Sequence, residues 1–309
     1  MSGNKKLRID REVIFSENPP YPKNMLVSLN NICNHRCVFC CNRKLNTNSP
    51  NIIEIELLIS IMQQAYDLGT REIGLYTTAE PFTSKILEDT VYKAREIGFE
   101  YIYLTTNGAL AVPKRVESVI KNGLHSIKFS INASDRETYK RVHGKDDFDK
   151  VIENIKSTDM LRKKINPNIG IFVSFVECAY SKGQADTLRE SLLPYIDEFY
   201  SYKAENIGGV MYEELNSGIL QESSVKTPCS MVFNRFHITP EGYLTACCTD
   251  FYNDMVVADL RDTPLNEAWN SDLFVNIRKQ HLYGEMYKGL LCYNCIHNTN
   301  ERVTPIYDL

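Results

Sequence analysis

The stretch Cys33-Asn34-His35-Arg36-Cys37-Val38-Phe39-Cys40 places three cysteines at the spacing C-x3-C-x2-C, with an aromatic residue just before the last one. Thiolates held at such short intervals on one loop favour soft metals, so the spacing predicts an iron–sulfur or zinc site. Three thiolates would bind three corners of a four-iron cluster and leave the fourth iron open to a small ligand. Cys41 follows directly, but neighbours on a tight loop point in different directions, so we expect a partly buried thiol there.

Short apolar segments alternate with amphipathic helical segments from residue 25 to about 204. This alternation predicts an α/β fold with parallel strands, either a sheet or a barrel covered by helices. Functional loops follow the carboxyl ends of such strands, and the cysteine loop directly follows the first one. We expect strands at residues 25–29, 73–77, 101–105, 126–131, 169–176 and 198–202, and helices at 54–68, 84–97, 112–122, 134–160 (broken near Gly144) and 182–193.

The cysteine loop resembles the signature of radical S-adenosylmethionine (SAM) enzymes. The resemblance implies an open, partial (β/α)6 barrel of TIM-like design that binds a [4Fe–4S] cluster through Cys33, Cys37 and Cys40. In that family the open iron chelates SAM, and reduction splits SAM into methionine and a 5′-deoxyadenosyl radical that abstracts hydrogen. Structural zinc, with Cys37 and Cys40 as half of a zinc knuckle, remains the alternative.

The segment Thr77-Thr78-Ala79-Glu80-Pro81-Phe82 resembles the G-G-E-P turn that contacts the SAM amino group in this family. Glu80 and Pro81 are kept, whereas Thr78 and Ala79 stand where glycines are usual. The resemblance therefore implies that Glu80 and Pro81 bind the cofactor. The alternative for Glu80 is a solvated loop carboxylate.

Further cofactor contacts are implied at the ends of the third and fourth strands and beside the last cysteine. Asn107 offers a donor and an acceptor, and Gly108 permits positive φ or close approach. Ser130 and Asn132 share a face by the two-residue strand period, and the family places polar groups there against SAM. Helix capping is the alternative for Asn132. Phe39 is expected near the adenine, or else in the core.

A second cysteine set lies near the end of the chain. Cys229 is followed by Gly242, Cys247 and the pair Cys292-x2-Cys295, a pattern that resembles the SPASM domain in its shortened, twitch form. The resemblance implies an auxiliary [4Fe–4S] cluster with four protein ligands, and a zinc ribbon is the alternative. We expect an N-terminal extension at 1–24, the barrel at 25–205 and this cysteine-rich domain at 206–309.

Composition narrows the class of protein. The chain has 309 residues, ten cysteines and a formal net charge of −4. It shows no apolar export signal or membrane-length run, so we expect a cytoplasmic protein in which cysteines bind metal rather than form disulfides. The sequence pI near 5.9 makes nucleic acid an unexpected partner.

Two residues at the end of the fifth strand bear on the reaction. Cys178 belongs to neither cysteine set, and its thiol could return a hydrogen atom to a substrate radical, which would give epimerisation. If its side chain points inward, Glu177 could bind a substrate hydroxyl or amine, or accept a proton during oxidation. A buried structural thiol is the alternative for Cys178. The histidines show no ligand spacing and are left unassigned.

The sequence as a whole resembles SPASM-type proteins of sugar and cell-envelope polysaccharide biosynthesis. It implies oxidation or epimerisation of a sugar, nucleotide sugar or aminocyclitol, with a reductant protein such as flavodoxin or ferredoxin as partner. Peptide side-chain modification is the second hypothesis. Residues 1–24 are too short for the leader-binding domain usual in peptide-modifying relatives. A non-catalytic iron–sulfur or zinc protein is the third.

Overall fold

The computed structural model describes residues 13–45 and 50–308. Its strands form one nine-stranded sheet in the order β6-β5-β4-β3-β2-β1-β7-β8-β9. The strands are β1 (Asn24–Val27), β2 (Glu72–Leu75), β3 (Tyr101–Thr106), β4 (Ser126–Ser130), β5 (Gly170–Glu177), β6 (Glu198–Lys203), β7 (Arg235–Ile238), β8 (Tyr243–Thr245) and β9 (Val256–Asp259).

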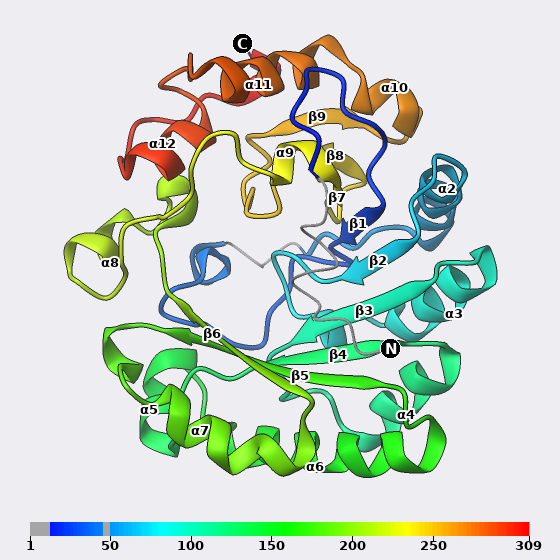
Figure 1. Ribbon diagram of the computed structural model, residues 1–309, viewed down its shortest axis with the longest axis vertical. Helices are drawn as coiled ribbons and strands as arrows, with labels where there is room; N and C mark the ends of the chain where they lie inside the picture. Colours follow the sequence, from blue (N-terminus) through cyan, green and yellow to red (C-terminus); the bar gives the residue numbers. More distant parts are fainter. Residues whose placement is uncertain (1–12, 46–49, 309) are drawn as a thin grey trace.

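The first six strands pair in parallel with their sequence neighbours, as the alternating pattern predicts. Their carboxyl ends therefore meet along one edge of the sheet. Strands β6 and β9 form the two edges, so the sheet stays open rather than closing into a complete barrel (Figure 1).

Helices follow most of the parallel strands. The α-helices are α2 (Ile55–Asp67), α3 (Leu87–Ile97), α4 (Pro113–Asn122), α5 (Arg136–His143), α6 (Phe148–Ile165), α7 (Ala185–Leu192), α8 (Tyr212–Asn216), α9 (Met231–Asn234), α10 (Leu265–Trp269), α11 (Asp272–Tyr283) and α12 (Leu291–His297). The 3-10 turns are η1 (Cys41–Lys44), η2 (Pro81–Thr83), η3 (Ala179–Ser181), η4 (Leu193–Tyr195), η5 (Ile207–Gly209) and η6 (Ile306–Asp308).

Local sequence signals explain where several of these helices begin and end. Pro113 occupies the first turn of α4, where its missing N–H costs no hydrogen bond. Gly123 ends that helix with φ of 114°, and Gly144 ends α5 with φ of 68°. The expected break near Gly144 therefore separates α5 from α6. The cap of α5 is Asp135, whose carboxylate accepts from Thr138 N–H at 2.8 Å.

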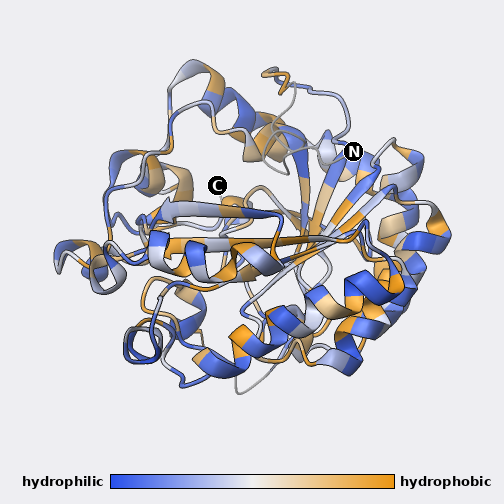
Figure 2. Cartoon of the chain, turned by 60° about the horizontal axis from the view of Figure 1, so that its bottom comes forward, coloured by the Kyte–Doolittle hydropathy of each residue, from blue (hydrophilic) through white to orange (hydrophobic). Residues whose placement is uncertain are grey.

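The core lies between the sheet and the helices on its outer side. Leu58, Ile61, Met62 and Ala65 of α2 are buried, and they recur at helical spacing. The surrounding helices carry both hydrophilic and hydrophobic residues (Figure 2), as expected for helices with one face on a sheet. Among the described residues, no helix combines the length and apolarity needed to cross a bilayer.

The C-terminal cysteine-rich segment joins the same sheet. Strand β7 pairs in parallel with β1, and the antiparallel strands β8 and β9 continue beyond it. Helices α10, α11 and α12 gather at that end of the molecule (Figure 1). The loss of alternation predicted after residue 205 is confirmed, and the division into domains at that point stays a prediction.

Candidate functional site

The loop that carries the first three cysteines follows β1 and is fixed to the end of α5. Arg36 N–H donates to the His143 carbonyl at 3.0 Å, and Val38 N–H donates to the Val142 carbonyl at 2.9 Å. Within the loop, Cys40 N–H donates to the Cys37 carbonyl at 3.1 Å. The cysteines therefore sit on a folded loop at the carboxyl edge of the sheet, as expected for a functional loop.

The three thiols share one partly buried environment. Burial raises the pKa of Cys33 to about 12 and also raises the pKa values of Cys37 and Cys40 above the usual thiol range. Negative charge on Cys33 or Cys40 would further raise the pKa of Cys37, so the three sulfurs are close enough to interact. Partly buried thiols on one loop fit an iron–sulfur cluster, which binds them as thiolates and displaces their protons.

Glu80 fastens the turn after β2 to the end of β3. Its Oε1 accepts from Phe82 N–H at 3.0 Å and from the Thr106 hydroxyl at 2.7 Å, and its Oε2 accepts from Asn107 N–H at 2.7 Å. The carboxyl is 3% exposed, and burial raises its pKa to about 7. The solvated-carboxylate alternative is therefore wrong. Pro81 is buried beside it in η2.

The backbone at Thr78 and Ala79 does not require glycine, because neither residue adopts positive φ. The Thr78 hydroxyl lies 3.1 Å from that of Ser28, and the Thr78 carbonyl accepts from the Asn42 side chain at 2.8 Å. Gly108 does need to be glycine. It has φ of 83°, and a Cβ there would lie 2.8 Å from the Phe129 ring.

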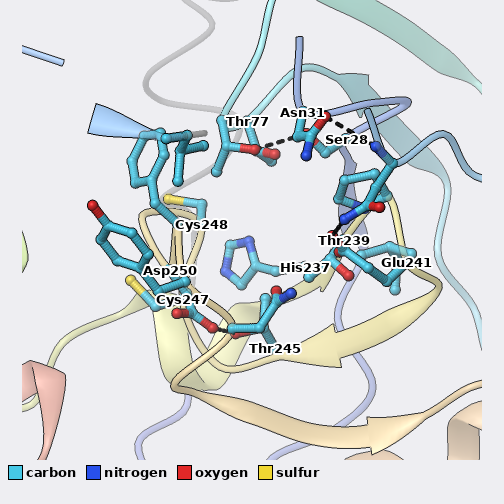
Figure 3. Close-up of a pocket in the computed structure, with 18 residues that line it drawn as sticks. Ser28, Asn31, Thr77, His237, Thr239, Glu241, Thr245, Cys247, Cys248 and Asp250 are labelled. Atoms are coloured by element: carbon cyan, nitrogen blue, oxygen red, sulfur yellow. Dashed lines mark hydrogen bonds between the residues drawn. The ribbon is translucent and has the colours of Figure 1, made fainter. Parts of the chain in front are cut away.

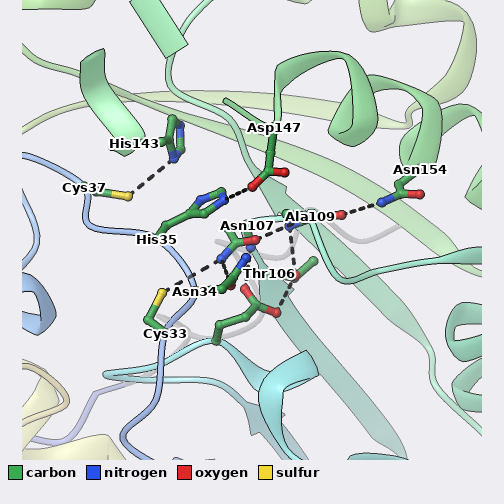
Figure 4. A network of polar contacts seen from close by, with 12 residues as sticks. Cys33, Asn34, His35, Cys37, Thr106, Asn107, Ala109, His143, Asp147 and Asn154 are labelled. Atoms are coloured by element: carbon green, nitrogen blue, oxygen red, sulfur yellow. Dashed lines mark hydrogen bonds and ion pairs between the residues drawn. The ribbon is translucent and has the colours of Figure 1, made fainter. Parts of the chain in front are cut away.

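Asn107 reaches from the end of β3 to the cysteine loop (Figure 4). Its Nδ2 donates to Asn34 Oδ1 at 2.9 Å and lies 3.9 Å from the Cys33 sulfur. Ser130 ends β4 opposite Ser174 of β5. The structure thus brings Asn107 to the expected cluster.

Asn132 lies beyond the end of β4, is 1% exposed and does not share the strand geometry of Ser130. Its Oδ1 accepts from Val176 N–H at 2.7 Å, while its backbone N–H donates to His143 Nε2 at 3.2 Å. The helix-cap alternative is wrong, since Asp135 caps α5. Asn132 therefore connects β5 to a histidine that sequence reasoning left unassigned.

His143 lies against the first cysteine set (Figure 4). Its Nδ1 is 3.3 Å from the Cys37 sulfur, although the two residues are 106 positions apart. His35 lies beside it, with ring centroids 5.4 Å apart, and His35 Nε2 lies 3.1 Å from the Asp147 carboxylate. Since such a pair depends on tertiary folding, no spacing pattern in the sequence could have revealed it.

Phe39 borders a cavity of about 470 Å³ at the ends of β5 and β6. Val176, Tyr202 and Ala204 line it with Phe39, together with polar side chains from the following segment. Glu177 is not among the lining residues. Its carboxylate accepts from Gly183 N–H at 2.9 Å, because alternate residues of a strand face opposite sides and Val176 takes the inner one.

Cys178 is 4% exposed and lies in an apolar cluster with Cys41, Val142, Ala204, Met211 and Leu220. Its sulfur is 3.7 Å from the Ser181 hydroxyl. Val38 and Phe39 of the cysteine loop pack on the same cluster. The structure therefore places Cys178 near the loop but in a sealed apolar setting, and its role as a hydrogen donor stays a prediction.

The second cysteine set surrounds an apolar cavity of about 370 Å³. All four expected ligands line it, together with the neighbouring residue Cys248: the sulfurs come from Cys229, Cys247, Cys248, Cys292 and Cys295. Two of them, Cys292 and Cys295, project from the short helix α12. Sequence reasoning gave no role to Cys248, and only the folded structure places it on this cavity.

A buried histidine in the wall supports a cluster in this cavity. Cys229 N–H donates to His281 Nδ1 at 3.4 Å, so the ring proton is on Nε2. His281 is 1% exposed, and its Nε2 has no hydrogen-bond partner among the described residues. A buried donor without an acceptor is costly, and cluster sulfides would supply acceptors. The residues present thus fit an iron–sulfur group.

A polar pocket of about 240 Å³ adjoins that cavity (Figure 3). Thr77 and Thr78 line it from the turn after β2, Ser28 from the end of β1, and His237 from β7. Cys247 and Cys248 line both this pocket and the auxiliary cavity, so the two spaces share a wall. The pocket therefore lies between the turn expected to bind SAM and the second cysteine set.

Comparison with protein families agrees with this arrangement. The family model of the radical SAM superfamily matches residues 27–171, and that of an iron–sulfur cluster-binding domain, SPASM, matches residues 229–296. Among curated proteins, a probable GTP 3′,8-cyclase of Saccharolobus islandicus is 30% identical over 135 residues, 44% of this chain and 43% of the relative. One of Sulfurisphaera tokodaii is 28% identical over 136 residues. The match thus spans less than half the length of these relatives.

Solved structures share the fold at low sequence identity. BtrN in complex with AdoMet and 2-DOIA has a TM-score of 0.59 at 18% identity, covering 85% of this chain and 89% of BtrN. SuiB of Streptococcus suis bound to precursor peptide SuiA has a TM-score of 0.68 at 16% identity, covering 85% and 68%. Native anSMEcpe with bound AdoMet has a TM-score of 0.63 at 13% identity, covering 92% and 94%.

These matches include the cysteine loop in the first family model and all four cysteines of the second set in the other. They imply SAM, a SAM-binding [4Fe–4S] cluster and an auxiliary iron–sulfur cluster, in agreement with the two groups of cysteines in the structure. The chain belongs to the radical SAM superfamily and carries a C-terminal SPASM auxiliary-cluster domain.

Proposed function

We propose that this enzyme removes hydrogen from a carbon of a small carbohydrate-like molecule and releases an oxidised product. When bound, the first cluster and SAM supply a 5′-deoxyadenosyl radical that abstracts the hydrogen atom. In this proposal Cys33, Cys37 and Cys40 hold that cluster, whereas Cys229, Cys247, Cys292 and Cys295 hold the auxiliary one. A flavodoxin- or ferredoxin-type protein supplies the electron that starts each turnover.

The shared wall between the polar pocket and the auxiliary cavity is the observation that carries the proposal. Cys247 and Cys248 belong to both spaces, and Thr77 and Thr78 border the pocket on the side of the Glu80 turn. A substrate in the pocket would lie one wall away from a site for an electron acceptor. Oxidation is favoured over epimerisation for this reason, and because Cys178 lies in a separate apolar cluster.

The size and lining of the pocket favour a single polar ring. Hydroxyl and amide side chains form half of its wall, contributed by Ser28, Asn31, Asn51, Thr77, Thr78, Thr239, Thr245, Tyr252 and Asn253. Side chains of this kind recognise hydroxyl groups by exchanging hydrogen bonds with them. The volume of about 240 Å³ lies below the roughly 300–1,000 Å³ of pockets for drug-sized ligands. A sugar or aminocyclitol suits it better than a peptide.

His237 is the group in this wall best suited to accept a hydrogen bond from a substrate hydroxyl. Its Nε2 lies 3.3 Å from the Met231 carbonyl oxygen, which can only accept, so Nε2 carries the proton and Nδ1 the lone pair. Nδ1 has no partner among the described residues. Burial lowers the pKa of His237 to about 3, so the ring is neutral and able to accept a hydrogen bond.

The cavity beside Phe39 is our candidate for the nucleoside part of SAM. It lies next to the last cysteine of the loop and offers apolar contact from Val176 together with polar groups such as Ser224. Asn107, Glu80 and Pro81 shape the opposite side of the loop. We propose that Glu80 positions Asn107 through its hydrogen bond rather than touching SAM itself, since its carboxylate is already fully engaged.

Anaerobically reconstituted enzyme with dithionite and SAM tests the proposal. The assay measures 5′-deoxyadenosine with D-glucose, D-glucosamine, myo-inositol, UDP-glucose, GTP or an unmodified peptide as added probe. We expect stimulation by a single-ring polyol or amino sugar, with deuterium passing from a labelled carbon into 5′-deoxyadenosine. His237→Phe should abolish stimulation but keep the basal cleavage of SAM.

The same assay decides against the proposal if only the peptide or GTP stimulates cleavage. Peptide modification is the second candidate, since SuiB was solved with its precursor peptide, although at 16% identity that likeness shows the fold alone. Product analysis in D2O separates oxidation from epimerisation. A carbonyl product supports oxidation, whereas an isomer with deuterium on carbon indicates return of a hydrogen atom from a thiol.

A further inference from the structure

A buried chain of hydrogen bonds ends on Cys37 of the SAM-binding loop, and Figure 4 shows its last link, between His143 and Cys37. It begins at β5, where Val176 N–H donates to Asn132 Oδ1 at 2.7 Å. This bond fixes the orientation of the Asn132 amide, so its Nδ2 faces His143 Nε2 at 3.3 Å as a donor. The Asn132 backbone N–H also donates to His143 Nε2, at 3.2 Å.

These two donors fix the tautomer of His143. A backbone N–H cannot accept, so Nε2 must present its lone pair to Asn132, and the single ring proton of the neutral imidazole is on Nδ1. Nδ1 lies 3.3 Å from the Cys37 sulfur and therefore donates to it. The side chain and the backbone of Asn132 both contact Nε2, and they thereby place the ring proton on Nδ1, which faces the Cys37 sulfur.

The surroundings hold the imidazole in this position. His143 is 1% exposed, and its ring stacks on Tyr139 at 4.1 Å between centroids, with 18° between the planes. The backbone carbonyl of His143 also accepts from Arg36 N–H, which joins the end of α5 to the cysteine loop itself. The backbone bond from Arg36 to His143 and the stack on Tyr139 thus hold the ring beside the Cys37 sulfur.

We propose that His143, positioned by Asn132, donates its Nδ1–H to Cys37 and thereby sets the reduction potential of the SAM-binding cluster. Hydrogen bonds to ligand sulfurs are one of the levers by which proteins adjust such potentials. A donor stabilises the added negative charge of the reduced cluster and so raises its potential. One electron enters from the external low-potential donor, and no proton transfer is required. The inference rests on Cys37 being a ligand of that cluster.

A redox titration followed by electron paramagnetic resonance tests the inference in the reconstituted, full-length enzyme. The signal of the SAM-binding cluster is the one that changes when SAM is added. His143→Leu removes the donor, His143→Asn retains an N–H near the Nδ1 position, and Tyr139→Phe is the matched control. The Tyr139 hydroxyl has no partner among the described residues, so its loss leaves the stacking intact.

We expect His143→Leu to make reduction about tenfold less favourable, which is about 59 mV for a one-electron couple. His143→Asn should recover most of this shift, and Tyr139→Phe should match the wild type. Equal potentials in all four proteins would overturn the inference. A shift of the same size in Tyr139→Phe would also overturn it, because it would point to general disturbance of packing.

If His143→Leu fails to retain iron, His143→Gln replaces it in the titration. The longer side chain places its amide near the Nε2 position, facing Asn132, and leaves the Cys37 sulfur without its donor, so a lowered potential supports the inference while an unchanged one contradicts it. Failure of the proposed function is distinguishable from these outcomes. Iron content and SAM cleavage by the wild type report whether the Cys37 cluster exists, independently of the potential at which it is reduced.

Discussion

The Oε2 atom of Glu80 accepts a hydrogen bond of 2.7 Å from the backbone N–H of Asn107, so the turn after β2 holds the turn after β3 in place. The Glu80 backbone N–H in turn donates to the Ile32 carbonyl at 3.0 Å, directly before Cys33. One buried residue thus connects three loops at the carboxyl edge of the sheet. Its side chain holds these loops in position through hydrogen bonds to Phe82, Thr106 and Asn107.

Stability should depend on pH through Glu80. Its folded pKa of about 7 lies above the unfolded value of 4.5, so the native state binds more protons between these values. Stability contributed by this group is therefore present below pH 4.5 and is lost as pH rises through 7, by on the order of 3 kcal/mol. Urea unfolding of the cluster-free protein at pH 5 to 8 measures this loss.

Glu80→Gln removes the titrating group, so its stability should change less with pH than that of the wild type. At pH 5 the wild-type carboxyl is protonated and also presents a donor, so the two proteins should differ by no more than about 1 kcal/mol in stability there. Parallel pH profiles for the two proteins would contradict the assignment of this pH dependence to Glu80.

Lys128 is a cation on the sheet with no carboxylate partner among the residues that the structure describes. It lies on β4 between Ser126 and Ser130, and its Nζ is 5.8 Å from the centroid of the Tyr76 ring. It makes no ion pair or hydrogen bond with any residue in the described part of the chain. Burial lowers its pKa from the usual 10.5 to about 8. The charged ammonium therefore costs stability at neutral pH.

Lys128→Met should raise the melting temperature at pH 7, since the stem is replaced by an apolar chain of similar length. The native protein binds fewer protons than the unfolded one between pH 8 and 10.5, so wild-type stability recovers as pH rises through that window. The advantage of the variant should shrink accordingly at pH 10. Calorimetry at both pH values decides, with the exposed Lys93→Met as control. A wild type more stable than the variant at pH 7 would contradict this prediction.

Removing two ligands of the auxiliary cluster should stop formation of the oxidised product but leave the cleavage of SAM. Cys292 and Cys295 project from α12 into a cavity apart from the Cys33 loop. The double variant Cys292→Ala/Cys295→Ala should fall from about eight to about four iron atoms per chain. It should still cleave SAM but form little oxidised product. Undiminished product formation would argue that the auxiliary site takes no part in the oxidation.

Much of the fold is predictable from local signals. Each of the six expected parallel strands occurs within two residues of its predicted bounds, because apolar segments are separated by residues such as Gly123 and Pro113 that end or begin helices. The pairing of β7 with β1 was not predicted. It joins residues more than 200 positions apart, and neither strand contains a signal for the other.

In the candidate site, too, local features were predictable and contacts between distant segments were not. Spacing on one loop was enough to single out Cys33, Cys37 and Cys40, whereas the partners of those thiols come from other elements. The bond from His143 to Cys37 depends on how α5 returns to the loop, and no periodicity encodes it. The predicted role of Glu177 depended on its side chain pointing inward, and it stays a prediction. Its strand position alone did not reveal which face of β5 points inward.

The central claim is that the loop of Cys33, Cys37 and Cys40 holds the cluster that binds and cleaves SAM. The most direct measurement compares wild type with Cys33→Ala/Cys37→Ala/Cys40→Ala after anaerobic reconstitution, following iron content and dithionite-dependent 5′-deoxyadenosine. We predict loss of about half the iron and of all 5′-deoxyadenosine in the triple variant. Retention of SAM cleavage by the triple variant would contradict the account.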